Sequence, residues 1–180
     1  MAVDYDWWGP RVIWYVLGAI SACIAIAAGA YVILLEGLVV HMAVHAPEFP
    51  FESAVAHMSL RASYSGSLNL KSPIPANEEN IAEGAKIFSS HCAGCHGHPQ
   101  TSSQMAKRMF PPPPQLLQSR DMVTDDPVGK IHWIVTNGIR MSGMPEFRSA
   151  LSDTQRWQIV LMLKHADKLP PAAQAALTAH

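Results

Sequence analysis

Cys92-Ala93-Gly94-Cys95-His96 lies near the middle of a chain of 180 residues. Two thiols separated by two residues and followed at once by an imidazole form the attachment pattern of a covalent c-type haem. Each thiol adds across one vinyl group of the porphyrin, and the imidazole then lies under the iron, for which it is a suitable ligand. The motif therefore predicts one haem bound covalently by Cys92 and Cys95, with His96 as the proximal axial ligand.

Three other interpretations of the cysteine pair are open. A redox-active dithiol of the thioredoxin type is expected after a strand in a βαβ context, and the sequence shows neither. A structural zinc site needs about four ligands in spaced pairs, and no second cysteine pair exists. The pattern could also arise by coincidence. The remaining cysteine, Cys23, lies in an apolar run, so a framework of disulfides is not predicted.

A helix is predicted immediately before the motif. Asn77, followed by two glutamates, is a suitable N-cap with acidic residues in the first turn, and the helix should run to about Ser90. Apolar and small residues recur along it at helical spacing, at positions 81, 84, 85 and 88. A glycine at position 84 costs stability in a helix unless another backbone packs closely against it.

The spacing of Gly84, Phe88, Cys92, Cys95 and His96 resembles the start of the class I cytochromes c, and the resemblance extends over residues 77–170. It implies an all-α domain that encloses one haem. In that family the glycine allows a C-terminal helix to cross closely, and the aromatic residue packs into the crossing. The resemblance therefore places both Gly84 and Phe88 around the haem.

Two further segments fit the same family. In Pro111-Pro112-Pro113-Pro114-Gln115-Leu116, Pro114 and Leu116 match a Pro-x-Leu stretch whose proline carbonyl accepts the Nδ1 proton of the haem histidine. A rigid extended loop without this role is the alternative, since four prolines impose such a segment. Gly143-Met144-Pro145 resembles the sequence that carries the distal methionine, so the resemblance implies Met144 as the second axial ligand. Met141 is its competitor.

The rest of this domain is also predicted to be helical. Asp126 and Pro127 are expected as the cap and first residue of one helix, and Asn137-Gly138 as its end. Ser152 and Gln155 form a capping box for a final helix that should run to about Lys168, before two prolines. We assign no function to residues beyond 171.

Two side chains of this region are candidates for the surroundings of the haem. Trp157, on the final helix, is expected to pack against Gly84 and Phe88. Arg140 could pair with a haem propionate, since a guanidinium matches a carboxylate, or could be a solvated surface residue.

The N-terminal part of the chain contains 24 residues without a charge, from Val12 to Leu35. As a helix this segment spans roughly 36 Å, enough for a hydrocarbon core of about 30 Å. Trp7 and Trp8 crowd one end, as in interfacial aromatic belts, and Glu36 is expected at head-group depth. A cleaved signal usually has a shorter apolar core and a basic start. A lipoprotein signal ending at Cys23 is a further alternative, although the apolar run continues beyond it.

These features predict three segments: a membrane anchor at 1–44 with a span at about 12–35, a linker at 45–76, and a haem domain at 77–180. The linker assignment rests on helix-breaking prolines at positions 47, 50, 73 and 75. Arg11, the only basic residue near either end of the span, favours an inside N-terminus. Covalent haem attachment then places the haem domain on the periplasmic side of a bacterial inner membrane. Small residues at positions 18, 22, 25 and 29 share one helix face, which could pack on a partner subunit.

The resemblance implies a single-electron carrier of a respiratory chain, with one covalently attached haem and His/Met ligation. Its expected partner is a redox protein or a membrane oxidoreductase of which it is a subunit, and a small-molecule substrate is not expected. A haem enzyme, such as a peroxidase or small-oxide reductase, is the alternative and needs an open iron position. The formal net charge of −1 gives no broad electrostatic basis for nucleic-acid binding.

Overall fold

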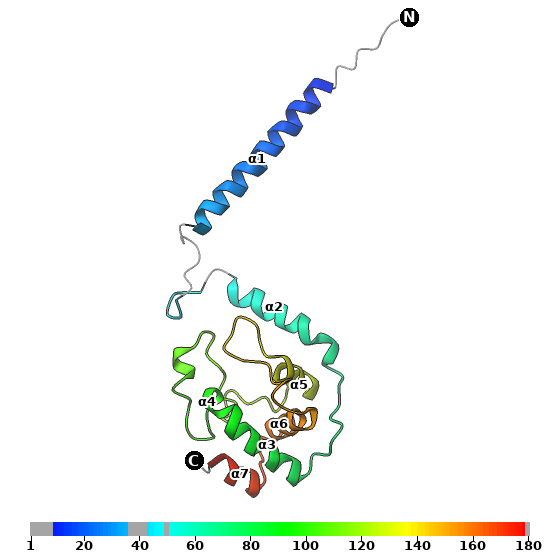
Figure 1. The fold of residues 1–180 in the computed structure, drawn as a ribbon, viewed down its shortest axis with the longest axis vertical. Coiled ribbons are helices and arrows are strands. Elements are labelled where there is room, and N and C mark those ends of the chain that lie inside the picture. The colour runs from blue at the N-terminus through cyan, green and yellow to red at the C-terminus, as the bar shows by residue number, and fades with distance from the viewer. Residues whose placement is uncertain (1–8, 36–42, 49–50, 179–180) are drawn as a thin grey trace, which may run out of the picture. The chain divides into compact units, whose positions relative to one another are not determined.

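The computed structural model describes residues 9–35, 43–48 and 51–178. These residues form an all-helical chain with one long apolar helix at the N-terminal end (Figure 1), as predicted. Contacts divide the chain into two units, residues 1–50 and 51–180. The elements in chain order are α1 (Gly9–Leu35), α2 (Glu52–Tyr64), the 3-10 turn η1 (Ser65–Ser67), α3 (Glu78–His91), α4 (Ala93–His96), the 3-10 turn η2 (Ala106–Arg108), α5 (Val128–Asn137), α6 (Asp153–Lys164) and α7 (Pro171–Thr178).

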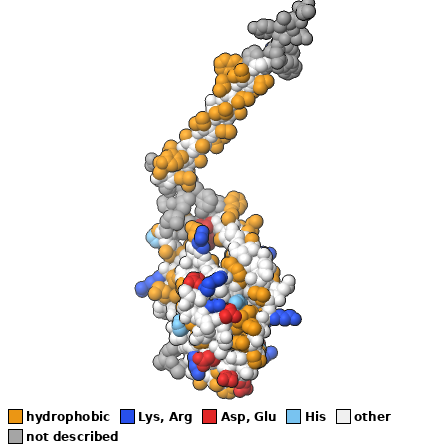
Figure 2. All heavy atoms as spheres, turned by 45° about the vertical axis from the view of Figure 1, so that its right-hand side comes forward, with side chains coloured by type: hydrophobic (Ala, Val, Ile, Leu, Met, Phe, Trp, Pro, Cys, Tyr) orange, Lys and Arg blue, Asp and Glu red, His pale blue; other side chains and the backbone are white. Residues whose placement is uncertain are grey.

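The first unit consists mainly of α1, which begins three residues before the predicted span and ends with it at Leu35. From Arg11 to Leu35 the helix is long and apolar enough to cross a membrane, by length and composition alone. Figure 2 shows hydrophobic side chains along its whole length. Trp7, Trp8 and Glu36, expected at the membrane interfaces, lie outside the described residues.

A helix, α2, occupies the middle of the segment that the sequence analysis treats as a linker. The four prolines lie at the two ends of that segment and leave residues 51–72 free of them. Because proline breaks helices only where it stands, the residues between can form one. α2 partly buries Leu60 and Tyr64, which are one turn apart, and leaves Phe51, Val55 and Met58 exposed on its opposite side.

Contacts with α5 attach this segment to the rest of the second unit. The ammonium group of Lys130 lies 5.7 Å from the centre of the Tyr64 ring. A Cβ built on Gly129 would collide with the carbonyl oxygen of Ser67 in η1 and would lie 3.1 Å from the Cβ of Leu70. The residues from 51 onward therefore belong to one compact unit.

The centre of the second unit is the crossing of α3 and α6 at Gly84. A Cβ built on Gly84 would lie 2.5 Å from the carbonyl carbon of Gln158 and 3.0 Å from the Cβ of Met162, and closer still to the Gln158 carbonyl oxygen. The two backbones therefore touch where Gly84 has no side chain. Phe88 and Met162 beside the crossing are fully buried.

The α6 residues nearest to a Cβ on Gly84 are Gln158 and Met162, and Trp157 lies about 100° from Gln158 around the helix. The Trp157 ring is buried and stacks on His132 of α5, with the ring centroids 4.0 Å apart and the planes 11° from parallel. Trp157 thus connects α6 to α5, and its packing against Gly84 and Phe88 stays a prediction.

Two of the three predicted helix starts have the expected caps. The side chain of Asn77 accepts a hydrogen bond from the Asn80 amide at 2.9 Å, and Ser152 with Gln155 forms a complete capping box. At α5, however, Pro127 itself is the N-cap, with an extended backbone, and is not the first helical residue. Asp126 makes no cap hydrogen bond to the helix and instead pairs with Lys130 at 2.6 Å.

The C-terminal end differs from the prediction. α6 ends at Lys164, four residues before Lys168, and the amide of His165 closes it by donating to the carbonyls of Leu161 and Met162. A further helix, α7, begins at Pro171, a residue type that is favoured at the start of a helix. It packs against α3 (Figure 1) and buries Ala173 and Leu177.

Candidate haem site

The cysteine motif forms a single helical turn at the end of α3. The amides of Cys95 and His96 both donate to the carbonyl of Cys92, at 3.1 and 2.9 Å, and this turn continues as α4. Gly97, with a φ of 73°, ends it. Cys92 and Cys95 lie three residues apart, slightly less than one helical turn, and their thiols line one cavity together with the imidazole of His96.

The imidazole of His96 is held by the polyproline loop. Its Nδ1 lies 2.8 Å from the carbonyl oxygen of Pro114. Burial lowers the pKa of His96, and the hydrogen bond to Pro114 opposes that effect without reversing it. The ring is therefore neutral with Nδ1–H as donor, so Nε2 carries a lone pair that is free to bind a metal. Of the four consecutive prolines, Pro114 provides the acceptor.

The loop that carries Pro114 is fastened to the cysteine turn at several points. The side-chain amide of Gln115 donates to the carbonyls of Cys95 at 3.2 Å and Pro113 at 3.0 Å. Its oxygen accepts from the amide of Ser103 at 2.8 Å. The hydroxyl of Ser103 donates in turn to the carbonyl of Gly94. These bonds fix the position of Pro114 relative to His96.

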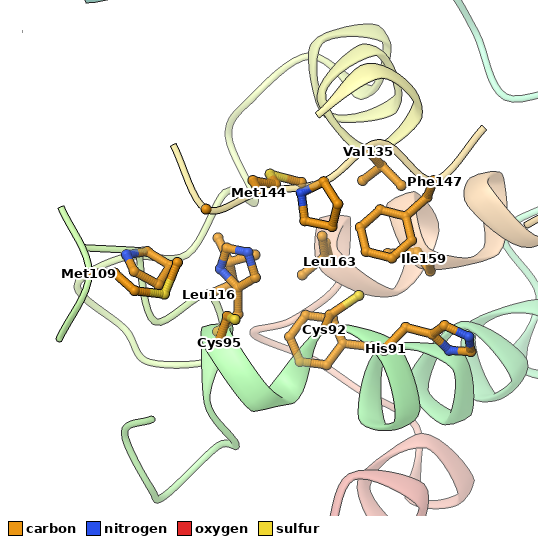
Figure 3. A pocket seen from close by; sticks show the side chains of 15 residues that line it. His91, Cys92, Cys95, Met109, Leu116, Val135, Met144, Phe147, Ile159 and Leu163 are labelled. Atoms are coloured by element: carbon orange, nitrogen blue, oxygen red, sulfur yellow. The ribbon is translucent and has the colours of Figure 1, made fainter. Parts of the chain in front are cut away.

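A cavity of about 270 Å³ lies beside the cysteine turn, and Figure 3 shows its lining. Met144, Val135 and Phe147 form one wall, and Cys92 and His91 lie on the wall opposite, with Ile159 and Leu163 of α6 between them. Its lining is almost entirely apolar apart from the motif itself. The complete lining consists of Phe88, His91, Cys92, Cys95, His96, Met109, Pro113, Leu116, Val135, Gly143, Met144, Pro145, Phe147, Ile159 and Leu163.

The two candidate distal methionines occupy different environments. Met144 is partly buried and lines the cavity, whereas the side chain of Met141 is 84% exposed and does not. The Met144 loop is held by hydrogen bonds within it: the amide of Ile139 donates to the Met144 carbonyl at 3.2 Å, and the Met144 amide donates to Ser142 Oγ at 3.2 Å. Of these two candidates, the cavity lining therefore favours Met144 over Met141.

The predicted surroundings of the haem divide into two groups. Phe88 and Leu116 line the cavity. Gly84 and Trp157 lie in the helix contacts behind it, and Arg140 is exposed and is not part of the lining. Sequence reasoning missed several lining side chains. Ile159 and Leu163, four residues apart on α6, carried a helical-spacing signal, whereas Met109 lies in a loop and carried none.

The thiol of Cys92 does not have the lowered pKa of a reactive cysteine. Burial, reinforced by the neighbouring thiol of Cys95, raises the pKa of Cys92 from 9.0 to about 12. Redox-active and nucleophilic cysteines have lowered pKa values instead. Within the described ranges, no three His, Cys, Asp or Glu side chains are grouped as a metal site of the zinc type requires.

The donor set does fit a covalent haem. Two thiols one helical turn apart, an imidazole with an oriented and unprotonated Nε2, and a thioether all line one apolar cavity. Imidazole and thioether are a known axial pair for haem iron, and an apolar lining suits the porphyrin. Outside the motif, His91 is the one polar side chain of this lining, and the other lining residues are apolar.

Comparisons with known proteins agree with this geometry. A family model described as cytochrome C oxidase, cbb3-type, subunit III matches residues 79–161. A curated protein of Nostoc sp. strain PCC 7120, named cytochrome c6-like, is 33% identical over 95 residues, which cover 52% of this chain and 78% of that protein. The chain belongs to the cytochrome c family, with one long apolar helix at its N-terminal end. It is a cytochrome c electron carrier, and members of the family carry covalent haem c.

Proposed function

We propose that the chain carries single electrons through one haem that is bound covalently by Cys92 and Cys95 and axially by His96 and Met144. The observation that supports this most directly is the pairing of two ligand side chains across one apolar cavity. His96 is oriented by Pro114, and Met144 is presented by a hydrogen-bonded loop.

The residues around the cavity suit this role. When bound, the haem supplies an iron that takes up and releases one electron. The loops that carry Pro114 and Met144 are both held by hydrogen bonds, so both ligands can keep their places through a change of charge. The apolar lining excludes water from the ligands, and a thioether favours the reduced state relative to a second histidine.

Visible spectroscopy of the purified protein tests the ligand assignment. The oxidised protein should show the weak red band that arises from methionine bound to ferric haem. Met144→Ala should abolish this band, and Met141→Ala, the matched control in the same loop, should retain it. Loss of the band in Met141→Ala alone would contradict the assignment. A high-spin spectrum of the unaltered protein would instead favour a haem enzyme with an open site.

We further infer that α1 is an uncleaved single-pass anchor that holds the haem domain at the periplasmic face of a bacterial inner membrane. The length and apolar character of α1 and the position of Arg11 at its start support this. Intact-mass analysis of the membrane fraction after an alkaline wash tests it. The mass of residues 1–180 plus one haem agrees with an anchor. A shortened chain, or one that carries lipid on Cys23, would contradict it.

We favour the proposal that the chain is a subunit of a membrane oxidoreductase of a respiratory chain. The family model named for an oxidase subunit supports it, as does the face of α1 formed by small residues at positions 18, 22, 25 and 29. Gly18→Leu with Gly29→Leu should release the chain from a complex extracted in mild detergent. Ala27→Leu, on the opposite face of the helix, is the control. Identical complexes from both variants would contradict the role of this face.

A further inference from the structure

Met109 contacts the loop that carries the distal methionine. It follows η2 in the segment between the cysteine turn and the polyproline loop. A Cβ built on Gly143 would collide with the terminal methyl group of Met109 and would lie 3.6 Å from its sulfur. The methionine side chain thus fills the space that a side chain at position 143 would need. Gly143 directly precedes Met144, so this contact is one residue away from the proposed axial ligand.

The segment that carries Met109 is firmly held on the side of His96. The Ser103 hydroxyl donates to the carbonyl of Gly94 and accepts from the amide of Ala106 at 3.3 Å, three residues before Met109. Ala106 is buried. On the other side of Met109, Gln115 ties the loop to Cys95. Met109 therefore extends from a fixed base, and both Met109 and Gly143 line the cavity (Figure 3 labels Met109).

We propose that Met109 is a positioning residue that holds the Met144 loop closed over the haem. It joins the loop that orients His96 to the loop that presents Met144, so that the two ligand-bearing segments are held together from one end of the cavity. This inference rests on the proposed function, because it concerns the strength of the bond between Met144 and iron. Gly143 is part of the same contact, since a Cβ at this position would displace the Met109 methyl group.

The probe for this contact is free imidazole, which binds ferric haem only where it displaces the methionine ligand. Loss of the red band on titration of the purified full-length protein gives an apparent dissociation constant. Met109→Ala removes the atoms that rest on Gly143, and we expect imidazole to bind about tenfold more tightly, because the Met144 loop then opens more easily. Met109→Leu, which restores most of the volume, should return the constant to within about threefold of the original. Met105→Ala, in the same segment but exposed, should leave it unchanged.

Gly143→Ala supplies a second variant that leaves Met109 itself in place. Its Cβ pushes the Met109 methyl group away, so imidazole should again bind more tightly. In the Met109→Ala background the same change should add little, because coupled residues show non-additive effects. If Met109→Ala yields no haem protein, Gly143→Ala alone decides: an unchanged constant overturns the proposal.

Three further outcomes would also overturn it. They are an unchanged imidazole constant in Met109→Ala, full additivity of the Met109 and Gly143 changes, and loss of the red band in Met109→Ala while Met144→Ala retains it. The last would make Met109 the ligand itself. Absence of the red band from the unaltered protein would refute the proposed function instead, and is seen before any variant is made.

Discussion

Gly84→Ala is the change that most directly tests whether backbone contact between α3 and α6 holds the second unit together. The added Cβ would lie 2.5 Å from the carbonyl carbon of Gln158, where ordinary contacts begin at 3.4 Å. The neighbouring atoms belong to the backbone of α6, which cannot rotate out of the way as a flexible side chain does. The helices must therefore separate by about 1 Å at this point, which loosens the packing of a close-packed interior.

The size of the effect follows from two opposing terms. Overpacking of a rigid contact costs about 3 kcal/mol. Alanine is favoured over glycine in a helix by about 1 kcal/mol, which offsets part of this. The net loss in the free energy of unfolding is then ~2 kcal/mol, and for a unit of this size each kcal/mol lowers Tm by roughly 3–5 °C, between the values for smaller and larger domains. We expect Gly84→Ala to melt roughly 6–10 °C below the original protein.

The decrease in Tm can be measured by thermal melting of the full-length haem protein in detergent. Haem absorption and near-ultraviolet circular dichroism follow the unfolding of the second unit without a contribution from α1. Gly94→Ala is the matched control, because Gly94 is also helical and a Cβ there meets nothing within 4 Å. It should melt at the same temperature or slightly higher. An equal or raised Tm for Gly84→Ala would refute the argument that the α3–α6 contact requires a glycine.

Three further predictions concern the loops and α5. Met141 has a φ of 59° and an exposed side chain, so Met141→Gly should raise the free energy of unfolding by about 0.5 kcal/mol in urea titrations and should retain the red band. A lower free energy of unfolding, or loss of the red band, would contradict this prediction. Gln115→Ala removes three hydrogen bonds from the polyproline loop and should cost ~2 kcal/mol, whereas Gln104→Ala, at an exposed position, should cost much less. Burial lowers the pKa of His132, although the Asp153 carboxylate opposes this effect. The unfolded chain therefore binds more protons at this histidine than the folded chain does, and the free energy of unfolding should fall as the pH drops below about 6.5. His132→Phe keeps a ring against Trp157 and should flatten that fall between about pH 7.5 and pH 5 in urea titrations; an unchanged slope would assign the pH dependence to other groups.

Features that depend on neighbouring residues were predictable from the sequence. The start of α3 at Asn77 and the capping box at Ser152 are local hydrogen-bonding patterns. The end of α5 at Gly138 is another, because a φ of 65° there suits glycine. The close approach at Gly84 was also predictable, since a glycine inside an amphipathic helix costs stability unless a neighbour uses the space.

Features that depend on contacts between distant segments were not predictable from the sequence. The prolines that flank α2 and α7 read as breaks, but a proline also permits a helix to begin after it. Whether a helix forms there depends on its packing against distant residues. In α7, Leu177 is buried in the core, and in α2, Tyr64 lies beside Lys130. Met109 lies in a loop without periodicity, so its contact with Gly143 appears only in the three-dimensional structure.

The cavity has a consequence for how the protein comes to be stable at all. Closed apolar cavities cost roughly 24 cal/mol for each Å³, so an apolar group that fills about 270 Å³ of this partly open cavity would contribute at most ~6 kcal/mol. That is comparable to the total stability of many small domains, which is about 5–15 kcal/mol. A haem attached at Cys92 and Cys95, as members of the family carry, would place a large apolar group in this space, although the sequence does not encode that group. Such a haem would complete the apolar core of the domain and would stabilise the folded chain relative to a chain that lacks it.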